Sequence, residues 1–204
     1  MMTRTTIPMA FLCLATAFAV RADEKKEDKP KGPDYSFMDL NQHDFKNKVL
    51  EYATFEESEL KEADFTNALA KGAVFTNANL TGANMRGADL RGADLRKAKV
   101  EGIKLRDTDL TGANLEGLDL TTGIDLIGLK LRGANLRNLK GMGNISDCTF
   151  AGADLRGANL TQMKDGGSIK SNFRKAKYDK ATSWPKGFDP VEAGALLVTE
   201  AEKK

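Results

Sequence analysis

The sequence holds few of the side chains that carry out chemistry. Its 204 residues include one histidine, His43, together with two cysteines and one tryptophan. One histidine and one cysteine cannot build the four-ligand zinc site that is usual in proteins. The glycine-containing stretch over residues 140–144 lacks the Gly-Lys-Ser/Thr that completes a phosphate-binding loop. We therefore expect no catalytic, cofactor-binding or metal site, and no enzyme activity.

An excess of charge of one sign is also missing. Lys and Arg together number 31, and Asp and Glu together number 29. Arg4 and Arg21 lie in the first 22 residues, so removal of that segment leaves 29 residues of each sign. A balanced charge creates no net positive field that attracts phosphate. We therefore expect no binding to nucleic acid.

A long hydrophobic run is absent as well. The apolar run over residues 7–20 is too short to span a bilayer comfortably. It follows Arg4, and it ends near Val20 and Ala22, small residues at the positions that a signal peptidase prefers. Residues 1–22 are therefore predicted to be a cleaved signal peptide, which leaves no membrane span and exports the protein to the periplasm, the cell envelope or the extracellular space. An uncleaved membrane anchor is the alternative.

The segment that follows the predicted cleavage site has no apolar groups to bury. Residues 23–36 are highly charged and contain two prolines. Such a composition predicts a disordered linker. Cys13 leaves with the signal peptide, so Cys148 stands alone and cannot form an internal disulfide.

What the chain has instead is a period of five residues. From Leu40 to Leu120 every fifth residue is large and apolar, with Ala70 as the exception. Neither a helix nor a flat strand keeps such a period on one face, so the pattern predicts a solenoid whose units bury their apolar sides against one another. We assign residues 37–183 to this solenoid and expect its structural core columns to be Leu40, Phe45, Leu50, Phe55, Leu60, Phe65, Phe75, Leu80, Met85, Leu90, Leu95, Val100, Leu105, Leu110, Leu115, Leu120, Leu126, Leu131, Leu136, Phe150, Leu155, Leu160, Phe173 and Tyr178.

A second series, mostly of small residues, lies two positions before the first. It contains Ala53, Ser58, Ala63, Ala68, Ala73, Ala78, Ala83, Ala88, Ala93 and Ala98. We expect these side chains to point inward too, at corners too narrow for a larger group. His43 and Cys148 fall in the same series, which predicts a structural histidine and a buried, inert thiol.

Short motifs within the units resemble those of a known protein family. The clearest units read Ala-Asn-Leu-Thr-Gly at residues 78–82, Ala-Asp-Leu-Arg-Gly at 88–92 and Ala-Asn-Leu-Glu-Gly at 113–117. They resemble the pentapeptide-repeat family, whose pattern is Ala-(Asp/Asn)-Leu-X-X, over residues 38–183. The resemblance implies an all-β fold, a right-handed quadrilateral β-helix with one unit per face and four units per coil. The Asp or Asn side chains can bond nearby backbone groups, and glycine suits corners that need a positive φ.

The five-residue register is disturbed at three places. Residues 121–125 add one residue to the repeat, and residues 140–144 remove one. Both slips are interpreted as bulges, with functional loops as the alternative. The longer disturbance over residues 163–169 is equally compatible with a bulge and with a functional loop, for instance one that carries a hydrolase site around Asp165.

The chain changes character after Tyr178. Residues 178–190 resemble the terminal segment of many bacterial pentapeptide-repeat proteins. Asp189 can cap a helix that has Pro190 at its first position, and Val191, Ala195, Leu196 and Val198 supply an apolar stripe. We therefore expect residues 184–204, with Trp184 and Phe188, to form a cap with a short helix over the last coil.

The expected function is that of a non-catalytic, exported module with a structural or protein-binding role. The protein partner is unknown, and the open ends of a solenoid allow an end-to-end dimer. Some members of the resembled family mimic DNA and regulate type II topoisomerases through a strongly acidic surface; the balanced charge and the export signal disfavour this alternative. Outward Arg86, Arg106, Lys71 and Arg91 are predicted to form solvated charge ladders, with an anion-binding stripe as the alternative.

Overall fold

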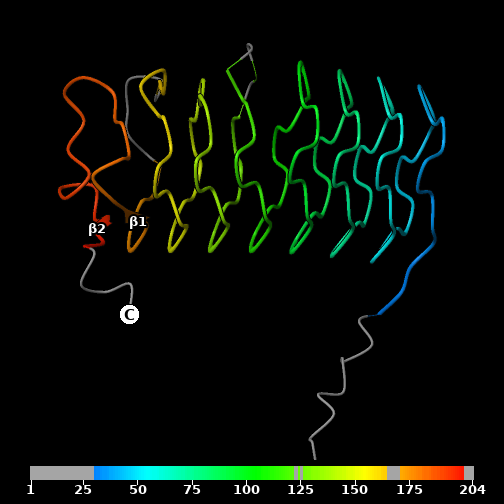
Figure 1. Cartoon of the computed structure of the whole chain (residues 1–204), viewed down its shortest axis with the longest axis horizontal. Helices are drawn as coiled ribbons and strands as arrows, with labels where there is room; N and C mark the ends of the chain where they lie inside the picture. Colours follow the sequence, from blue (N-terminus) through cyan, green and yellow to red (C-terminus); the bar gives the residue numbers. More distant parts are fainter. Residues whose placement is uncertain (1–29, 122–123, 125, 165–170, 200–204) are drawn as a thin grey trace, which may run out of the picture.

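The computed structural model describes residues 30–121, 124, 126–164 and 171–199. The predicted signal peptide and residues 23–29 of the predicted linker lie outside these residues. Within them the chain winds into a stack of similar coils along one axis, from the amino end to the carboxyl end (Figure 1). No helix in these ranges has the length and apolar character needed to cross a membrane.

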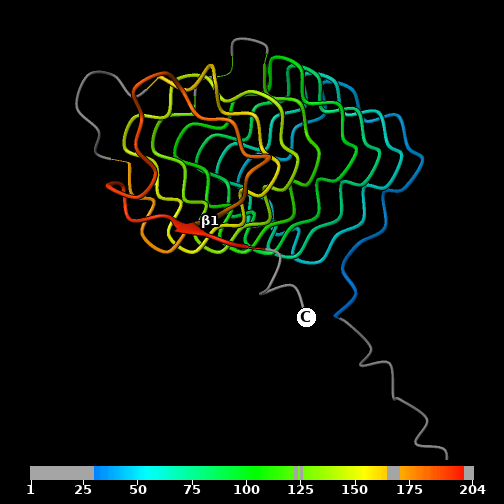
Figure 2. The same cartoon turned by 60° about the vertical axis from the view of Figure 1, so that its left-hand side comes forward.

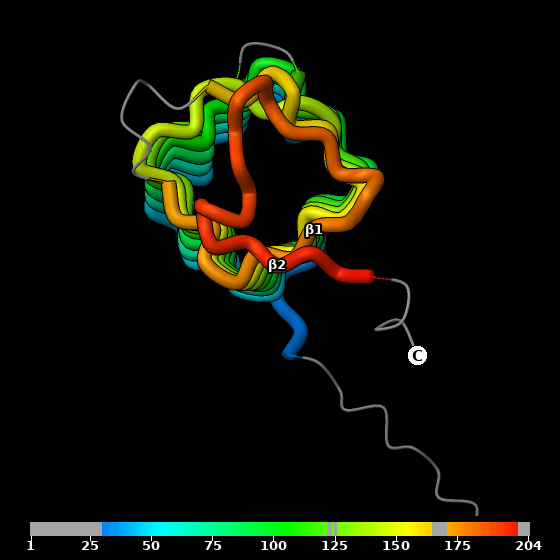
Figure 3. Tube along the Cα trace, turned by 90° about the vertical axis from the view of Figure 1, so that its left-hand side faces the viewer, coloured from blue at the N-terminus to red at the C-terminus, as the bar shows by residue number. Residues whose placement is uncertain are grey.

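Each coil is four-sided, and successive coils follow the same outline (Figures 2 and 3). Parallel backbone bridges join each face to the same face of the next coil, such as Asp89 to Asp109 and Asp94 to Asn114, twenty residues apart. We name the faces by their inward residues in one coil: the Leu80, Met85, Leu90 and Leu95 faces. The only strands longer than one bridge in the described chain are β1 (Lys177–Tyr178) and β2 (Leu196–Leu197).

Corner turns explain why the strands are so short. In most five-residue units the turn closes with a backbone hydrogen bond, such as Ala83 N–H to Leu80 O at 3.0 Å. The second residue of the turn has a positive φ, +70° at Gly82. Asn67 and Lys97 adopt the same conformation, at +55° and +60°. Glycine avoids the strain of this conformation, so the frequent glycine at this position follows from backbone sterics.

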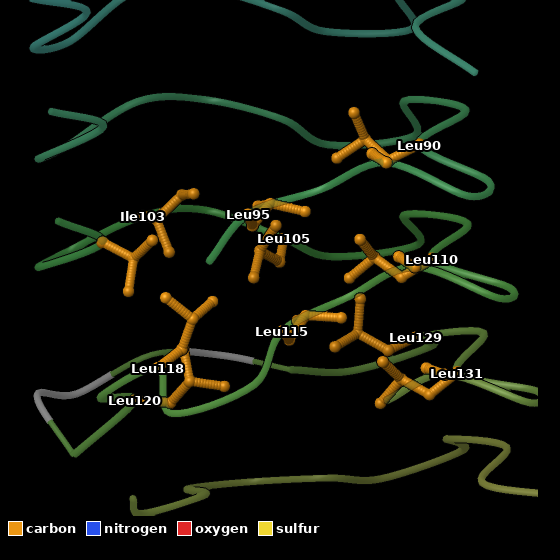
Figure 4. Packing of buried hydrophobic residues seen from close by; sticks show 14 of the residues in the cluster. Leu90, Leu95, Ile103, Leu105, Leu110, Leu115, Leu118, Leu120, Leu129 and Leu131 are labelled. Carbon is orange, nitrogen blue, oxygen red and sulfur yellow. The ribbon is translucent and has the colours of Figure 1, made fainter. Parts of the chain in front are cut away.

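The interior of the tube is filled with apolar side chains. All of the expected core residues are buried except Leu40, which lies in the first coil and is partly buried. Successive leucines form columns, as Leu90, Leu110 and Leu131 do on one face (Figure 4). The aromatic coils stack in the same way: the rings of Phe55 and Phe75 are 4.9 Å apart and nearly parallel.

The inner corners tolerate larger groups than the sequence predicts. Ile103, Leu118 and Leu129 occupy the position two before the core leucine and are buried (Figure 4). The expectation that only small residues fit there is therefore wrong for the middle coils. Polar residues also fit where they find a backbone partner: Thr108 Oγ1 donates to Met85 O at 2.8 Å, and Ser58 Oγ donates to Phe55 O at 2.7 Å.

The two single-residue slips leave the stack intact. Across the first slip the bridged residues are 21 apart, as in Asn114 with Asn135, and across the second they are 19 apart, as in Asn135 with Asp154. Both pairs belong to the Leu95 face, so the second slip restores the spacing that the first one changed. Residues 122, 123 and 125 of the first slip and 165–170 of the third disturbance lie outside the described residues.

Gly141 makes the second slip possible. It occupies the inward position where a core leucine would lie, and its φ is +68°. A Cβ at this position would lie 2.7 Å from Thr121 Cα and closer still to Thr121 Cγ2. The neighbouring side chain of Met142 is 1 % exposed and supplies apolar volume beside the glycine.

The carboxyl end corrects one expectation, because no helix forms among residues 184–199. Asp189 does cap a turn: its Oδ1 accepts the N–H groups of Val191 and Glu192 at 2.8 and 3.1 Å. Gly194, at φ +83°, ends the turn at once. Its N–H bonds Val191 O, and the N–H of Ala195 bonds Pro190 O, which is the hydrogen-bond pattern that terminates helices.

After this turn the chain adds a strand instead of a second helical turn. Leu196 N–H donates to Ala176 O at 2.7 Å, and β2 lies parallel to β1. The segment between the two strands folds across the carboxyl end of the tube (Figure 3). Trp184 and Phe188 stack there at 4.9 Å, and both rings contact Phe173 edge-on. These residues cover the last coil as expected, without a helix.

The amino end of the solenoid begins earlier than the sequence predicts. Gly32 N–H donates to Tyr52 O at 3.1 Å, and Asp34 bridges Thr54. The prediction that the linker extends to residue 36 is therefore wrong, since residues 32–36 already pair with the following coil. Tyr35, which precedes Leu40 by one unit, stacks on Phe55 at 5.0 Å.

The slip at Gly141 leads to a prediction about stability. Gly141→Ala should lower the free energy of unfolding by more than about 3 kcal/mol, because the methyl group meets backbone at a left-handed φ. Gly133→Ala is the matched control: its φ is also positive, but nothing lies within 4 Å of its added Cβ. The control should cost only about 1–2 kcal/mol. Urea denaturation of the two variants measures the difference, and equal losses would contradict the steric argument.

Candidate interaction surfaces

The side chains most often used in catalysis are not brought together. His43 is exposed, with its ring 4.5 Å from that of Phe45, so the expectation that it points inward is wrong. The reason is its place in the first described coil, where no preceding coil covers the corner. Cys148 is 2 % exposed, and its Sγ contacts the carbonyl oxygen of Leu126. In the described part of the chain, no three His, Cys, Asp or Glu residues are grouped so that they could hold a metal ion.

An Asp or Asn precedes many of the core residues and organises the outer surface. Its side-chain oxygen accepts the backbone N–H two residues later, as in Asp64 to Thr66 at 2.9 Å and Asn135 to Arg137 at 3.2 Å. This local hydrogen bond satisfies a backbone donor at the start of the turn. The expectation that these side chains bond nearby backbone groups is confirmed.

An arginine after the core residue folds back when Asp precedes that residue. Arg91 Nε and Nη2 donate to Asp89 at 2.8 and 2.6 Å. The same two-pronged pair joins Arg96 to Asp94, at 2.9 and 2.6 Å. Arg156 and Asp154 repeat the arrangement. Such paired charges agree with the predicted ladders at Arg91 and supply no free cation there.

These bonds shift the acidity of the carboxylates. The side-chain hydrogen bond from Arg91 lowers the pKa of Asp89 below its usual value, with a smaller opposing effect from burial. At Asp154 burial acts to raise the pKa, but the hydrogen bonds and charge of Arg156 outweigh it, so the pKa is lowered. The pKa of Asp119 is also lowered, because its carboxylate accepts hydrogen bonds from the hydroxyl and the N–H of Thr121.

Hollows on the outer surface include two that are lined by charged side chains of the described residues. One, of about 440 Å³, lies on the Leu80 face and is lined by Lys99, Glu101, Asp119 and neighbouring residues. The other, of about 370 Å³, lies at the corner after the Leu90 face and is lined by Arg132, Ala151, Gly152, Arg174 and Lys175. The first has charges of both signs, whereas the second has only positive charges.

Sequence reasoning named Arg86, Arg106, Lys71 and Arg91 as the outward basic residues and missed Arg132 and Arg174. A signal for the missed pair was present. The residue two before Arg91 is an aspartate, whereas Lys130 and Asn172 hold that place before Arg132 and Arg174. Arg132 and Arg174 therefore lack the aspartate that binds Arg91 within its own unit.

The lowered pKa values lead to a prediction about acid stability. A carboxylate whose pKa is lowered by folding stabilises the native state above its unfolded pKa of about 4, and this contribution is lost as the pH falls through the folded pKa. The double variant Asp89→Asn/Asp154→Asn should therefore lose less stability between pH 6 and pH 2.5 than the parent does, by about 1 kcal/mol for the two pairs. Asn keeps the turn hydrogen bond, as Asn135 shows.

The control is Asp39→Asn, which removes a carboxylate that is followed two residues later by Asn41 instead of arginine. Guanidinium denaturation at each pH gives the free energies. An equal change in acid sensitivity for the control and the double variant would contradict the role assigned to the arginines.

Comparisons with known proteins agree with the repeat geometry. A model of pentapeptide repeats matches eight copies, over residues 58–96, 88–122 and 144–163. No protein of curated function matches the sequence.

Among solved structures, the chain is 30 % identical to alr5209, a pentapeptide repeat protein from Nostoc PCC 7120; the match covers 71 % of this chain and 84 % of that one, with a TM-score of 0.28. HetL, a pentapeptide repeat protein involved in heterocyst differentiation regulation in Nostoc sp. PCC 7120, is 23 % identical, with coverage of 81 % and 79 % and a TM-score of 0.37. QnrB1, a plasmid-mediated fluoroquinolone resistance protein, is 18 % identical, with coverage of 84 % and 93 % and a TM-score of 0.47.

The family follows from the eight matched repeats, the identity to alr5209 and the observed coils with one five-residue unit on each face. Proteins with this repeat fold as right-handed quadrilateral β-helices. The chain belongs to the pentapeptide-repeat family.

Proposed function

We propose that the protein is a non-catalytic, exported solenoid that serves as a rigid scaffold for contacts with another protein. The filled interior is the observation that carries this proposal. Phe55, Leu80, Leu90 and Leu95 are at most 1 % exposed, and they are stacked above equivalent residues of the next coil. A packed tube of this kind leaves no internal space for a substrate, so recognition falls to the outer faces.

The rigidity of those faces also supports a scaffold. Every coil donates backbone hydrogen bonds to its neighbour, such as Leu90 N–H to Asp109 O and Leu95 N–H to Asn114 O, at 2.8 and 2.9 Å. Outward side chains are therefore held at spacings set by the backbone. A partner that fits such a surface loses less conformational entropy on binding than one that must order a mobile surface.

The outer charge favours a protein partner that recognises a mixed polar surface. It disfavours a role as a DNA mimic that binds a type II topoisomerase. A DNA mimic needs rows of unpaired carboxylates. Here Asp89, Asp94 and Asp154 are paired with arginines, and Lys46 pairs with Asp64 at 3.2 Å. The proposal therefore places recognition in the mixed polar pattern of a face and in the cap, instead of in a continuous acidic stripe.

Site-specific photocrosslinking tests the scaffold role. A photoreactive phenylalanine derivative is placed at one exposed position of each face in turn: Glu101, Arg86, Arg91 or Arg96. In the source cell we expect a covalent adduct with the same protein from one face or from two adjacent faces, while the other faces act as controls. Adducts from none of the four faces, or the same mixture of abundant proteins from all of them, would contradict the proposal.

Export is tested separately. The small residues before Asp23 motivate the proposed cleavage after Ala22. Amino-terminal sequencing of the protein isolated from its source cell should begin at Asp23, and the protein should be recovered from the envelope or extracellular fraction. A chain that begins at Met1 or Met2 in the cytosolic fraction would overturn the export part of the proposal without affecting the scaffold part.

A further inference from the structure

One corner of the solenoid differs from the others because glycine removes its side chains. After the Leu90 face, the second turn residue is glycine in five consecutive coils: Gly72, Gly92, Gly112, Gly133 and Gly152. A Cβ built on any of the last four meets nothing within 4 Å, whereas a Cβ on Gly72 would lie against the ring of Tyr52. The backbone itself therefore forms the surface along this corner. Lys175 takes the same position in the next coil and ends the row.

The basic hollow of about 370 Å³ lies at the carboxyl end of this row. Arg132 and Arg174 lie one coil before and one coil after Ala151 and Gly152, as the backbone pairing shows. Since neighbouring strands are about 4.8 Å apart, the two arginine backbones are about 10 Å apart along the tube axis. Between them, Ala151 and Gly152 leave a floor without long side chains.

The cations of this hollow have no acidic partner in the described chain. Arg91, Arg96 and Arg156 are neutralised by the aspartate two residues before each of them. Arg132 and Arg174 follow Lys130 and Asn172 instead, and neither they nor Lys175 pairs with a carboxylate among residues 30–121, 124, 126–164 and 171–199.

Nearby carboxylates are already engaged. Asp109, one coil before Arg132, lies 3.8 Å from the Nζ of Lys130. Asp154, which follows Gly152 on the next face, is held by both prongs of Arg156. The hollow therefore keeps its positive charge even though the whole protein is almost neutral.

From these observations we propose that the hollow binds a linear polyanion whose repeated phosphate or sulfate groups lie along the glycine corner. The two guanidinium groups can each take one oxyanion through two parallel hydrogen bonds, and Lys175 adds a third positive charge. The glycine floor lets the chain of the ligand approach the backbone between them. This site is independent of the proposed protein scaffold and adds a ligand class to it.

An aspartate two residues before an arginine binds that arginine, and this relation supplies a test that leaves Arg132 and Arg174 in place. Asn172→Asp should fold Arg174 onto the new carboxylate, as Asp89 folds Arg91, and the hydrogen bond that the Arg174 N–H donates to the side-chain oxygen of residue 172 can be kept. Lys130→Asp should do the same to Arg132. Asn84→Asp is the matched control, because it makes the same chemical change two residues before Arg86 on the Met85 face.

Binding is measured by titration calorimetry of the full chain at low ionic strength, with short-chain sodium polyphosphate in one arm and short-chain dextran sulfate, a linear sulfated chain, in the other. Asn172→Asp and Lys130→Asp should each weaken binding about tenfold, as expected when a charged hydrogen-bonding partner is lost. Asn84→Asp should change the affinity by less than about twofold, because salt screens the interaction of its charge with a ligand in the distant basic hollow. Binding of one probe alone would assign the oxyanion to that source.

Several outcomes would overturn the proposal. They are no measurable binding of either probe by the parent chain, an equal loss for Asn84→Asp and Asn172→Asp, or tighter binding of duplex DNA than of both probes. Arg132→Ala/Arg174→Ala, compared with Arg91→Ala/Arg96→Ala, provides a second pair in case an aspartate variant does not fold. The first double variant should lose binding and the second should keep it.

Discussion

Backbone pairing between coils is the constraint on which the rest of this structure depends. Each face contributes one bridging residue, and this residue exchanges hydrogen bonds with the two residues that flank its equivalent in the adjacent coil, as Asp109 does with Ala88 and Leu90. Because this pairing requires equivalent residues to lie above one another, each core residue packs against the core residues of the coils above and below it. The core columns, the inner corners and the outer ladders are all consequences of this one register.

The same constraint explains how the fold accommodates irregularity. Inserting one residue over residues 121–125 does not break the pairing that follows, since Lys130 bridges Asp109 and Asn135 bridges Asn114. Removing one residue is harder, because the chain must take a shorter path into the next face. Gly141 permits this path since it has no side chain to collide with Thr121. Regular coils on both sides can then remain stacked.

The outer surface obeys a local rule that is independent of the core. An aspartate before the core residue binds the arginine after it, and an asparagine or lysine at that position does not neutralise the arginine. Charge on this solenoid is thus set by the pairs within single units more than by overall composition. A nearly neutral protein can in this way present a basic corner around Arg132 and Arg174.

The sequence alone determined the repeat, the inward columns and the turn positions, since a five-residue period has few structural solutions and each inward residue repeats in the same place. It could not determine features that depend on what lies in the adjacent coil. His43 is exposed because its coil is the first in the part of the chain that the structure describes, and Ile103 and Leu118 fit inner corners because of how the neighbouring coils pack. Gly194 ends the capping turn, and the free edge of the Tyr178 strand then takes Leu196 and Leu197 as β2. Likewise, the grouping of Arg132, Arg174 and Lys175 around a glycine floor exists only in the tertiary structure, because stacking brings together residues that lie about forty positions apart in the chain.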